Sequence, residues 1–119
     1  VRGQAFEDAI AAGAYPIDIH PAQGGGLHYR DLGPDHAYGI PYRSLIPTTL
    51  DNALVAGRGL SATHEALAAI RVMTISMAVG QAAGTAAALA CAGPPDGRVR
   101  EVAPAALRAA LRRDGAILP

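Results

Sequence analysis

The spacing of apolar and polar residues changes along the chain, and each change predicts a different element. The region 72–92 holds no charged residue and predicts one long helix. Before it, the apolar run 53–56 lies between the turn-prone Asp51 and Asn52 and a glycine, Gly57, which predicts a short buried strand. We expect the chain to be organised around 50–92, because this region alone combines a strand, a glycine loop and a long helix.

Weaker patterns on either side predict smaller elements. Apolar residues at helical spacing predict a short helix over 3–12, and a second, amphipathic helix over 104–113. Alternating residues at 15–20 and 27–32, on either side of three consecutive glycines, predict a hairpin, and 38–45 predicts an extended edge segment. This order of elements indicates an α+β or α/β fold with a small irregular sheet.

The long apolar helix has two interpretations. Its length would suffice for a membrane span, and Gly80 and Gly84 match the small-xxx-small spacing of paired membrane helices. However, Ala, Gly, Ser and Thr dominate it and Gln81 lies near its middle, so insertion into lipid would gain little free energy. We therefore favour a helix packed closely against a sheet or ligand, with these larger packing residues: Val72, Ile75, Met77, Val79 and Leu89.

The start of this helix is the first candidate binding position. The first backbone N–H groups of a helix have no intrahelical acceptor and carry the positive end of the helix dipole. Here those groups begin around Val72 and Met73, directly after Arg71. They predict a site for an anion, or for a group that becomes negative during a reaction.

Several motifs, taken in order and at their spacings, carry a family resemblance. They are the segments 6–10, 15–20, 40–45, 51–58, 61–66, 70–73 and 80–87. Together they resemble the C-terminal portion of a family of FAD-dependent oxidoreductases whose members are often labelled xanthan-lyase-related. The resemblance implies FAD as cofactor and hydride transfer between a substrate and the flavin.

The resemblance also implies a division of the chain. It assigns 1–49 to a substrate-domain-like part and 50–119 to the C-terminal part of the FAD-binding domain. Its cofactor-binding candidates are Gly57, Arg58, Arg71, Val72 and Met73. Its substrate-side candidates are Asp18, His20, Tyr42, Arg43 and His64.

One family feature is missing from these residues. A Gly-x-Gly-x-x-Gly fingerprint, which would hold the FAD pyrophosphate at a helix start, does not occur. We therefore expect the chain alone to bind FAD weakly or not at all, and to associate with a nucleotide-binding half or with itself. The alternative function is a non-enzymatic folded fragment or assembly module.

Composition narrows the choice of partners and location. The net charge is zero and the basic residues are scattered arginines, so no basic face for nucleic acid is expected. The single cysteine, Cys91, cannot form an internal disulfide, and in an apolar helix it is expected to be an inert core thiol. We expect a cytoplasmic protein with no nucleic-acid or membrane partner.

Two further polar groups allow other chemistries. Asp18, His20, His28 and His36 could supply metal ligands across a hairpin, but their spacing matches no known ligand signature, so no metal is predicted. Ser61, Thr63 and His64 could suggest a hydrolase, but no Gly-x-Ser-x-Gly turn precedes them. The second group is better explained by a serine or threonine that caps a short helix.

Overall fold

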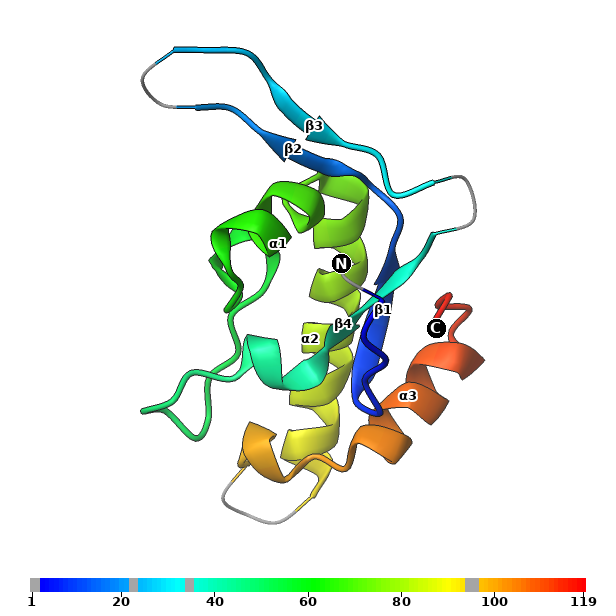
Figure 1. Ribbon diagram of the computed structural model, residues 1–119. Coiled ribbons are helices and arrows are strands. Elements are labelled where there is room, and N and C mark those ends of the chain that lie inside the picture. The colour runs from blue at the N-terminus through cyan, green and yellow to red at the C-terminus, as the bar shows by residue number, and fades with distance from the viewer. Residues whose placement is uncertain (1–2, 22–23, 34–35, 94–96) are drawn as a thin grey trace.

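A bent antiparallel β-ribbon forms the N-terminal part of the molecule in the computed structural model, which describes residues 3–21, 24–33, 36–93 and 97–119. Strand β1 (Ala9–Gly13) pairs with β4 (Tyr38–Pro41), and β2 (Ile17–Ile19) pairs with β3 (His28–Arg30). Because β1 leads into β2 and β3 returns to β4, the two sheets are successive parts of one ribbon (Figure 1). The hairpin predicted from 15–20 and 27–32 is confirmed.

In the part of the chain that the structure describes, three α-helices pack beside this ribbon. They are α1 (His64–Ile70), α2 (Met73–Ala92) and α3 (Pro104–Arg113). Single turns of 3₁₀ helix form η1 (Tyr42–Leu45), η2 (Gly57–Gly59) and η3 (Val99–Glu101). The predicted long helix and terminal amphipathic helix are confirmed, and so is the mixed α+β class. Thr63 caps α1, since its side chain accepts a hydrogen bond from Ala66 N at 3.2 Å.

The core lies where α2 crosses β1 and meets α3. One stripe of α2 is buried, formed by Ile75, Val79, Ala82, Ala86 and Ala90, which recur every three to four residues. The approach to the ribbon is close: a Cβ on Gly13 would lie 2.6 Å from Tyr38 Cε2 and 2.9 Å from Ile75 Cδ1. Small residues at this contact thus let helix and strand backbones pack together.

The helix predicted over 3–12 is wrong. The chain turns at Glu7 and Asp8, and Ala9–Gly13 is strand β1, whose residues are almost all buried. A strand covered on both faces is apolar throughout and shows no alternation, so its sequence pattern can be mistaken for that of a buried helix. Tertiary packing against α2 and β4 outweighs the helix propensity of alanine.

Three other predictions about the central region are wrong. The run 53–56 is not a buried strand: it has no regular secondary structure, and Val55 is exposed. Met77 does not pack in the core, because 73 % of its surface is accessible. Cys91 is also exposed, near the C-terminal end of α2. The extended segment predicted over 38–45 is confirmed only to Pro41, because η1 begins at Tyr42.

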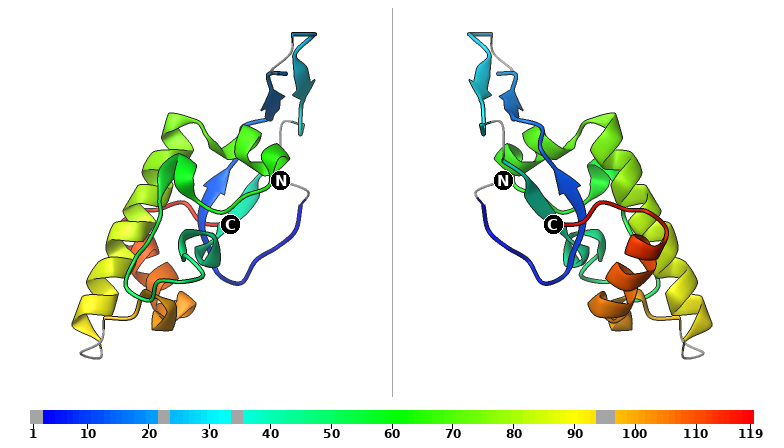
Figure 2. Two further views of the ribbon diagram at one scale, coloured as in Figure 1. Left: turned by 90° about the vertical axis from the view of Figure 1, so that its left-hand side faces the viewer. Right: turned by 90° about the vertical axis from the view of Figure 1, so that its right-hand side faces the viewer.

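The molecule exposes more surface than a compact chain of its size. Its radius of gyration is 15.1 Å, against about 13.5 Å expected for this length. Its accessible surface is 7249 Å², against about 6000 Å² expected for a compact monomer of this mass. Part of the excess comes from the β2–β3 hairpin, which projects from the body (Figure 2).

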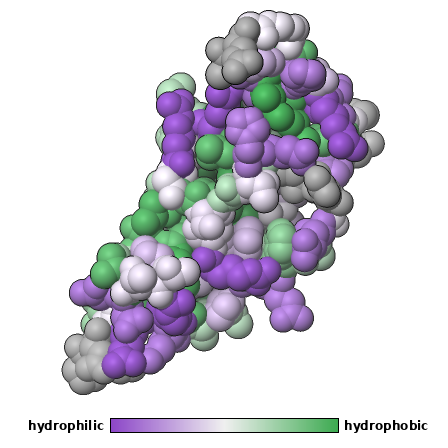
Figure 3. All heavy atoms as spheres, turned by 60° about the vertical axis from the view of Figure 1, so that its left-hand side comes forward, coloured by the Kyte–Doolittle hydropathy of each residue, from purple (hydrophilic) through white to green (hydrophobic). Residues whose placement is uncertain are grey.

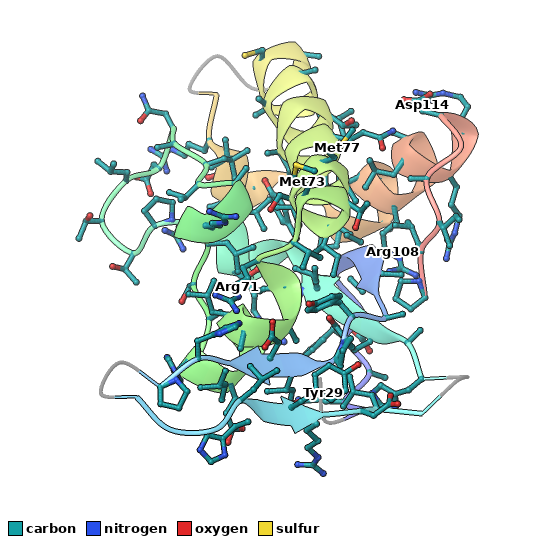
Figure 4. All side chains as sticks on the ribbon, turned by 90° about the horizontal axis from the view of Figure 1, so that it is seen from above. Tyr29, Arg71, Met73, Met77, Arg108 and Asp114 are labelled. Atoms are coloured by element: carbon teal, nitrogen blue, oxygen red, sulfur yellow. The ribbon has the colours of Figure 1, made fainter. Side chains whose placement is uncertain are left out.

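The outer face of α2 adds to this exposed surface. Hydrophobic residues form a band along the flank where α2 lies (Figure 3), and Met73 and Met77 both project from that helix (Figure 4). α2 is also the helix, among those described, that is long and apolar enough to cross a membrane, with a mean hydropathy of 1.4. The core helix of a soluble protein can have the same length and composition, but such a helix is mostly buried, whereas 28 % of the apolar window of α2 is buried.

Candidate functional site

Segments more than 50 residues apart in sequence meet at Asp18 in β2. The guanidinium of Arg71 donates from Nη2 to Asp18 O at 2.9 Å, and the same nitrogen lies 3.5 Å from Asp18 Oδ2. Arg71 follows the last residue of α1, two residues before α2 begins, so its backbone is fixed by both helices (Figure 4). The contact places the hairpin beside the start of α2.

The carboxylate of Asp18 has a second set of neighbours. Tyr15 OH donates to Oδ2 at 3.4 Å, and His20 Nε2 lies 3.3 Å from Oδ2 in hydrogen-bonding geometry. His20 directly follows β2, and this contact places its ring beside the Asp18 carboxylate. We call Tyr15, Asp18, His20 and Arg71 the Asp18 group.

One oxygen of the Asp18 group is not satisfied. Within the described part of the chain, Asp18 Oδ1 is buried and accepts no hydrogen bond of normal geometry, although His20 Nε2 lies 3.2 Å away. The Asp18 side chain as a whole is only 15 % exposed. A buried carboxylate oxygen without a donor is costly, and a ligand could donate to it only if the side chains that cover it moved aside.

The predicted cofactor candidates gather at the junction of η2, α1 and α2. Gly57 begins η2 with φ of +63°, a conformation that glycine adopts without strain. Arg58 then donates from Nε to Arg71 O at 3.2 Å, which satisfies a carbonyl at the C-terminal end of α1. The structure thus brings Arg58, Arg71, Val72 and Met73 together.

The start of α2 has no side-chain cap. Val72 is the N-cap, with φ −74° and ψ 153°, and the first intrahelical bond runs from Ser76 N to Val72 O at 3.0 Å. The amides of Met73, Thr74 and Ile75 therefore have no acceptor within the helix. Beside them lies an open pocket of about 400 Å³, lined by Val72, Thr74, Ile75 and residues 12–16. This arrangement can bind a negative group or a carbonyl oxygen.

The other substrate-side candidates lie elsewhere. Tyr42 is buried and donates to Val99 O at 2.7 Å, and burial raises the pKa of its hydroxyl to about 12. Arg43 pairs with Asp8 at 2.8 Å, and His64 is an exposed first residue of α1. None of the contacts described for these three side chains joins them to Asp18, and their assignment to the substrate stays a prediction.

Sequence reasoning did not include two residues of this region. Tyr15 donates to Asp18 from three residues upstream, and Thr74 lines the pocket at the start of α2. The short spacing between Tyr15 and Asp18 was a usable signal, since both belong to one motif. Thr74 gave no such signal, because a threonine in an apolar helix is ordinary. Among the described residues, no group of three or more His, Cys, Asp or Glu side chains could hold a metal ion.

Comparison with known proteins gives one positive result. The family model described as "FAD dependent oxidoreductase" matches residues 1–111, which is nearly the whole chain. Comparisons with curated proteins and with solved structures give no match.

Proposed function

The chain belongs to the FAD dependent oxidoreductase family, and from this premise we propose that it forms the flavin-facing portion of such an enzyme, with the flavin edge at the start of α2. The observation that carries the proposal is the uncapped first turn of α2 beside an open pocket and the Asp18 group. Family membership implies dependence on FAD, and the residues at this position have the chemistry that a flavin edge needs.

The donor and acceptor groups match the edge of a flavin. The pyrimidine edge of the ring presents carbonyl oxygens and one N–H group. The free amides of Met73 and Thr74 are donors suited to the carbonyl oxygens, and the Asp18 carboxylate, which is covered in this structure, would be an acceptor for the N–H group if it became exposed. Arg71 adds a positive charge next to these groups, 39 % exposed and held in place by Asp18. The free amides and the charge of Arg71 support the proposal of a flavin ring edge at this position.

Each residue has a defined role in this proposal. Bound FAD supplies the hydride chemistry, accepting or donating at its N5 atom. The amides at the start of α2 stabilise negative charge on the pyrimidine edge, and they cost no reorganisation because the helix fixes them. Arg58 holds the end of α1 through Arg71 O, so that the helix start is kept in position. Asp18 and His20 orient groups on the substrate side.

The nucleotide end of FAD needs residues outside these 119. No Gly-x-Gly-x-x-Gly fingerprint occurs among them, so we propose that a separate nucleotide-binding part holds the pyrophosphate and that this chain alone has little activity. The exposed apolar face of α2 and the excess accessible surface support a docking partner there. The narrower xanthan-lyase-related label, the cytoplasmic location and the absence of nucleic-acid and membrane partners stay predictions.

The test changes one amide at the start of α2. Met73→Pro removes the N–H of the first helical residue, where proline is tolerated, and the extended Val72 before it is compatible with a following proline. In the protein assembled with its nucleotide-binding part, we expect the two-electron potential of the flavin to fall by about 30 mV. This corresponds to about 1.4 kcal/mol of lost preference for the reduced form.

The matched control is Met73→Ala, which removes the same side chain, 78 % exposed, and keeps the amide. We expect Met73→Ala to leave the potential unchanged. Equal potentials in Met73→Pro, Met73→Ala and the parent protein, with FAD bound and the fold intact, would show that this helix start does not face the flavin.

A further inference from the structure

A second pocket lies away from the Asp18 group, where η1, η3 and α3 meet the N-terminal segment. Its volume is about 760 Å³, within the range of about 300–1000 Å³ that is usual for small-molecule sites. Four arginines line it, namely Arg43, Arg100, Arg108 and Arg112. The acidic residues in the lining are Glu7 and Asp8. We call it the basic pocket, because its lining carries an excess of two positive charges.

Three of the arginines are held in place by the fold. Arg43 donates from Nη1 to Asp8 Oδ1 at 2.8 Å, and its guanidinium carbon lies 5.0 Å from the Phe6 ring centroid. Arg100 donates from Nη2 to Pro47 O at 2.7 Å. Arg108 donates from Nη1 to Ala9 O and from Nη2 to Pro119 O. These contacts fix the guanidinium groups and so reduce the entropy that a ligand would lose in ordering them.

The fixed arginines keep unused donors. A guanidinium has five N–H groups, and the contacts of Arg43, Arg100 and Arg108 use only one or two of them. The Pro47 and Ala9 carbonyl oxygens add no charge, whereas Pro119 O belongs to the last residue of the sequence and is a carboxylate oxygen in the 119-residue chain, and Asp51 Oδ1 lies 3.7 Å from Arg100 Nε. Among the described residues, Arg43 pairs with a side-chain carboxylate at hydrogen-bonding distance, and Arg100 and Arg112 do not.

Arg112 differs from the other three. Within the described part of the chain no hydrogen bond or ion pair holds its side chain, and it is exposed on α3. Pro104 and Ala105, in the first turn of the same helix, also line the pocket, and α3 has no side-chain cap. The free amide of Ala105 adds to the positive potential that the arginines create.

We propose that the basic pocket binds a small molecule that carries two negative charges on carboxylate or phosphate groups. Arginines bind such groups through paired N–H donors, and the excess of two charges matches a dianion. Glu7, exposed at the rim and without a partner among the described residues, opposes the ligand and limits its affinity. The site is distinct from the proposed flavin site, since the two pockets share no lining residue.

The test is titration of the 119-residue chain with inorganic phosphate and, separately, with malonate, at an ionic strength held constant with sodium chloride. Amide and arginine Nε shifts in ¹⁵N-labelled protein report both affinity and location. We expect saturable binding with the shifts concentrated at Ala105, Arg108 and Arg112. A response to only one of the two probes would identify the anion as a phosphate or as a dicarboxylate.

Three variants separate a site from general attraction by charge. Arg112→Gln should weaken binding by about tenfold, since it removes a charged donor. The matched control is Arg113→Gln, the next residue of α3, which faces Asp114 at 3.4 Å and does not line the pocket. It should change the affinity by less than about twofold, which is within the effect of a screened exposed charge. Glu7→Gln should tighten binding several-fold.

Two results would overturn the proposal. One is the absence of saturable binding of both probes in the low-millimolar range. The other is an equal loss of affinity in Arg112→Gln and Arg113→Gln, which would show that the anions respond only to net charge. Neither result bears on the flavin, because none of these variants touches the Asp18 group or the start of α2.

Discussion

Substitution of the two glycines inside α2 tests directly whether the exposed face of this helix is uncovered in the isolated chain and serves as a docking surface. Gly80 and Gly84 both lie within the helix, neither has a positive φ, and a Cβ added to either would meet no atom within 4 Å. Glycine in a helix interior is about 0.8–1.0 kcal/mol less favourable than alanine. We therefore expect the double substitution Gly80→Ala with Gly84→Ala to raise the free energy of unfolding of the isolated chain by about 1–2 kcal/mol.

Urea unfolding followed by circular dichroism measures this change. With a slope of about 2 kcal/mol per molar urea, the midpoint should rise by about 0.5–1 M while the slope stays the same. Gly13→Ala is the contrasting control, because its Cβ would lie 2.6 Å from Tyr38 Cε2, and it should destabilise the chain. A fall in the midpoint of the double variant would show that the face is covered at close range in solution.

The same double substitution should act in the opposite direction on assembly. Alanine methyl groups would keep a partner backbone from approaching α2 as closely as glycine allows, so binding of the nucleotide-binding part, or self-association, should weaken. Sedimentation of the variant and parent chains measures this. If the variant is more stable and still associates as strongly as the parent, the docking surface lies elsewhere than on this face.

The remaining predictions concern the buried tyrosines. Tyr42→Phe should lower the free energy of unfolding by about 1–3 kcal/mol, because Val99 O loses the hydrogen bond that it accepts at 2.7 Å; urea unfolding at neutral pH measures the loss. Stability should also fall between pH 10 and 12: burial raises the pKa of Tyr38 and Tyr42 to about 12, so the unfolded chain releases their protons first. In Tyr42→Phe this fall with pH should be about half as large, and an unchanged fall would mean that Tyr42 does not contribute to it.

Local patterns predicted the elements whose stability is mainly local. Pro104 at the first position, leucines four residues apart and terminal arginines mark α3 without ambiguity. The glycines between β2 and β3 likewise mark a hairpin. The prediction for the segment that forms strand β1 was wrong because its sequence, AIAAG, fits a buried strand and a buried helix equally well. This segment becomes a strand because it pairs with β4, which lies about thirty residues later in the chain. A local sequence pattern cannot show such a pairing.

In the candidate site too, sequence patterns could not show contacts between residues that are far apart in the chain. Sequence spacing placed Asp18 and His20 on one strand face, and it placed Arg71 just before α2. It could not bring Arg71 to Asp18, a contact across 53 residues that depends on how the hairpin lies over α1. Nor could it find the basic pocket, whose arginines come from η1, η3 and α3 and look like scattered surface charges along the chain.

The separation of the two pockets constrains what a ligand in the basic pocket can do. The Asp18 group lies at the start of α2, whereas the basic pocket includes Val102, which also lines a hollow with Leu89 and Ala90 near the end of that helix. Asp8 in the lining of the basic pocket and Ala12 in the lining of the pocket at the start of α2 are four residues apart in the chain, so their Cα atoms are at most about 14 Å apart. The two pockets nevertheless share no lining residue, so we expect no hydride transfer between the anion and a flavin bound at the start of α2. An influence of the anion on the flavin could pass through β1, which joins Asp8 of one lining to Ala12 of the other, and it would appear as an equal change in the affinity of each ligand caused by the other.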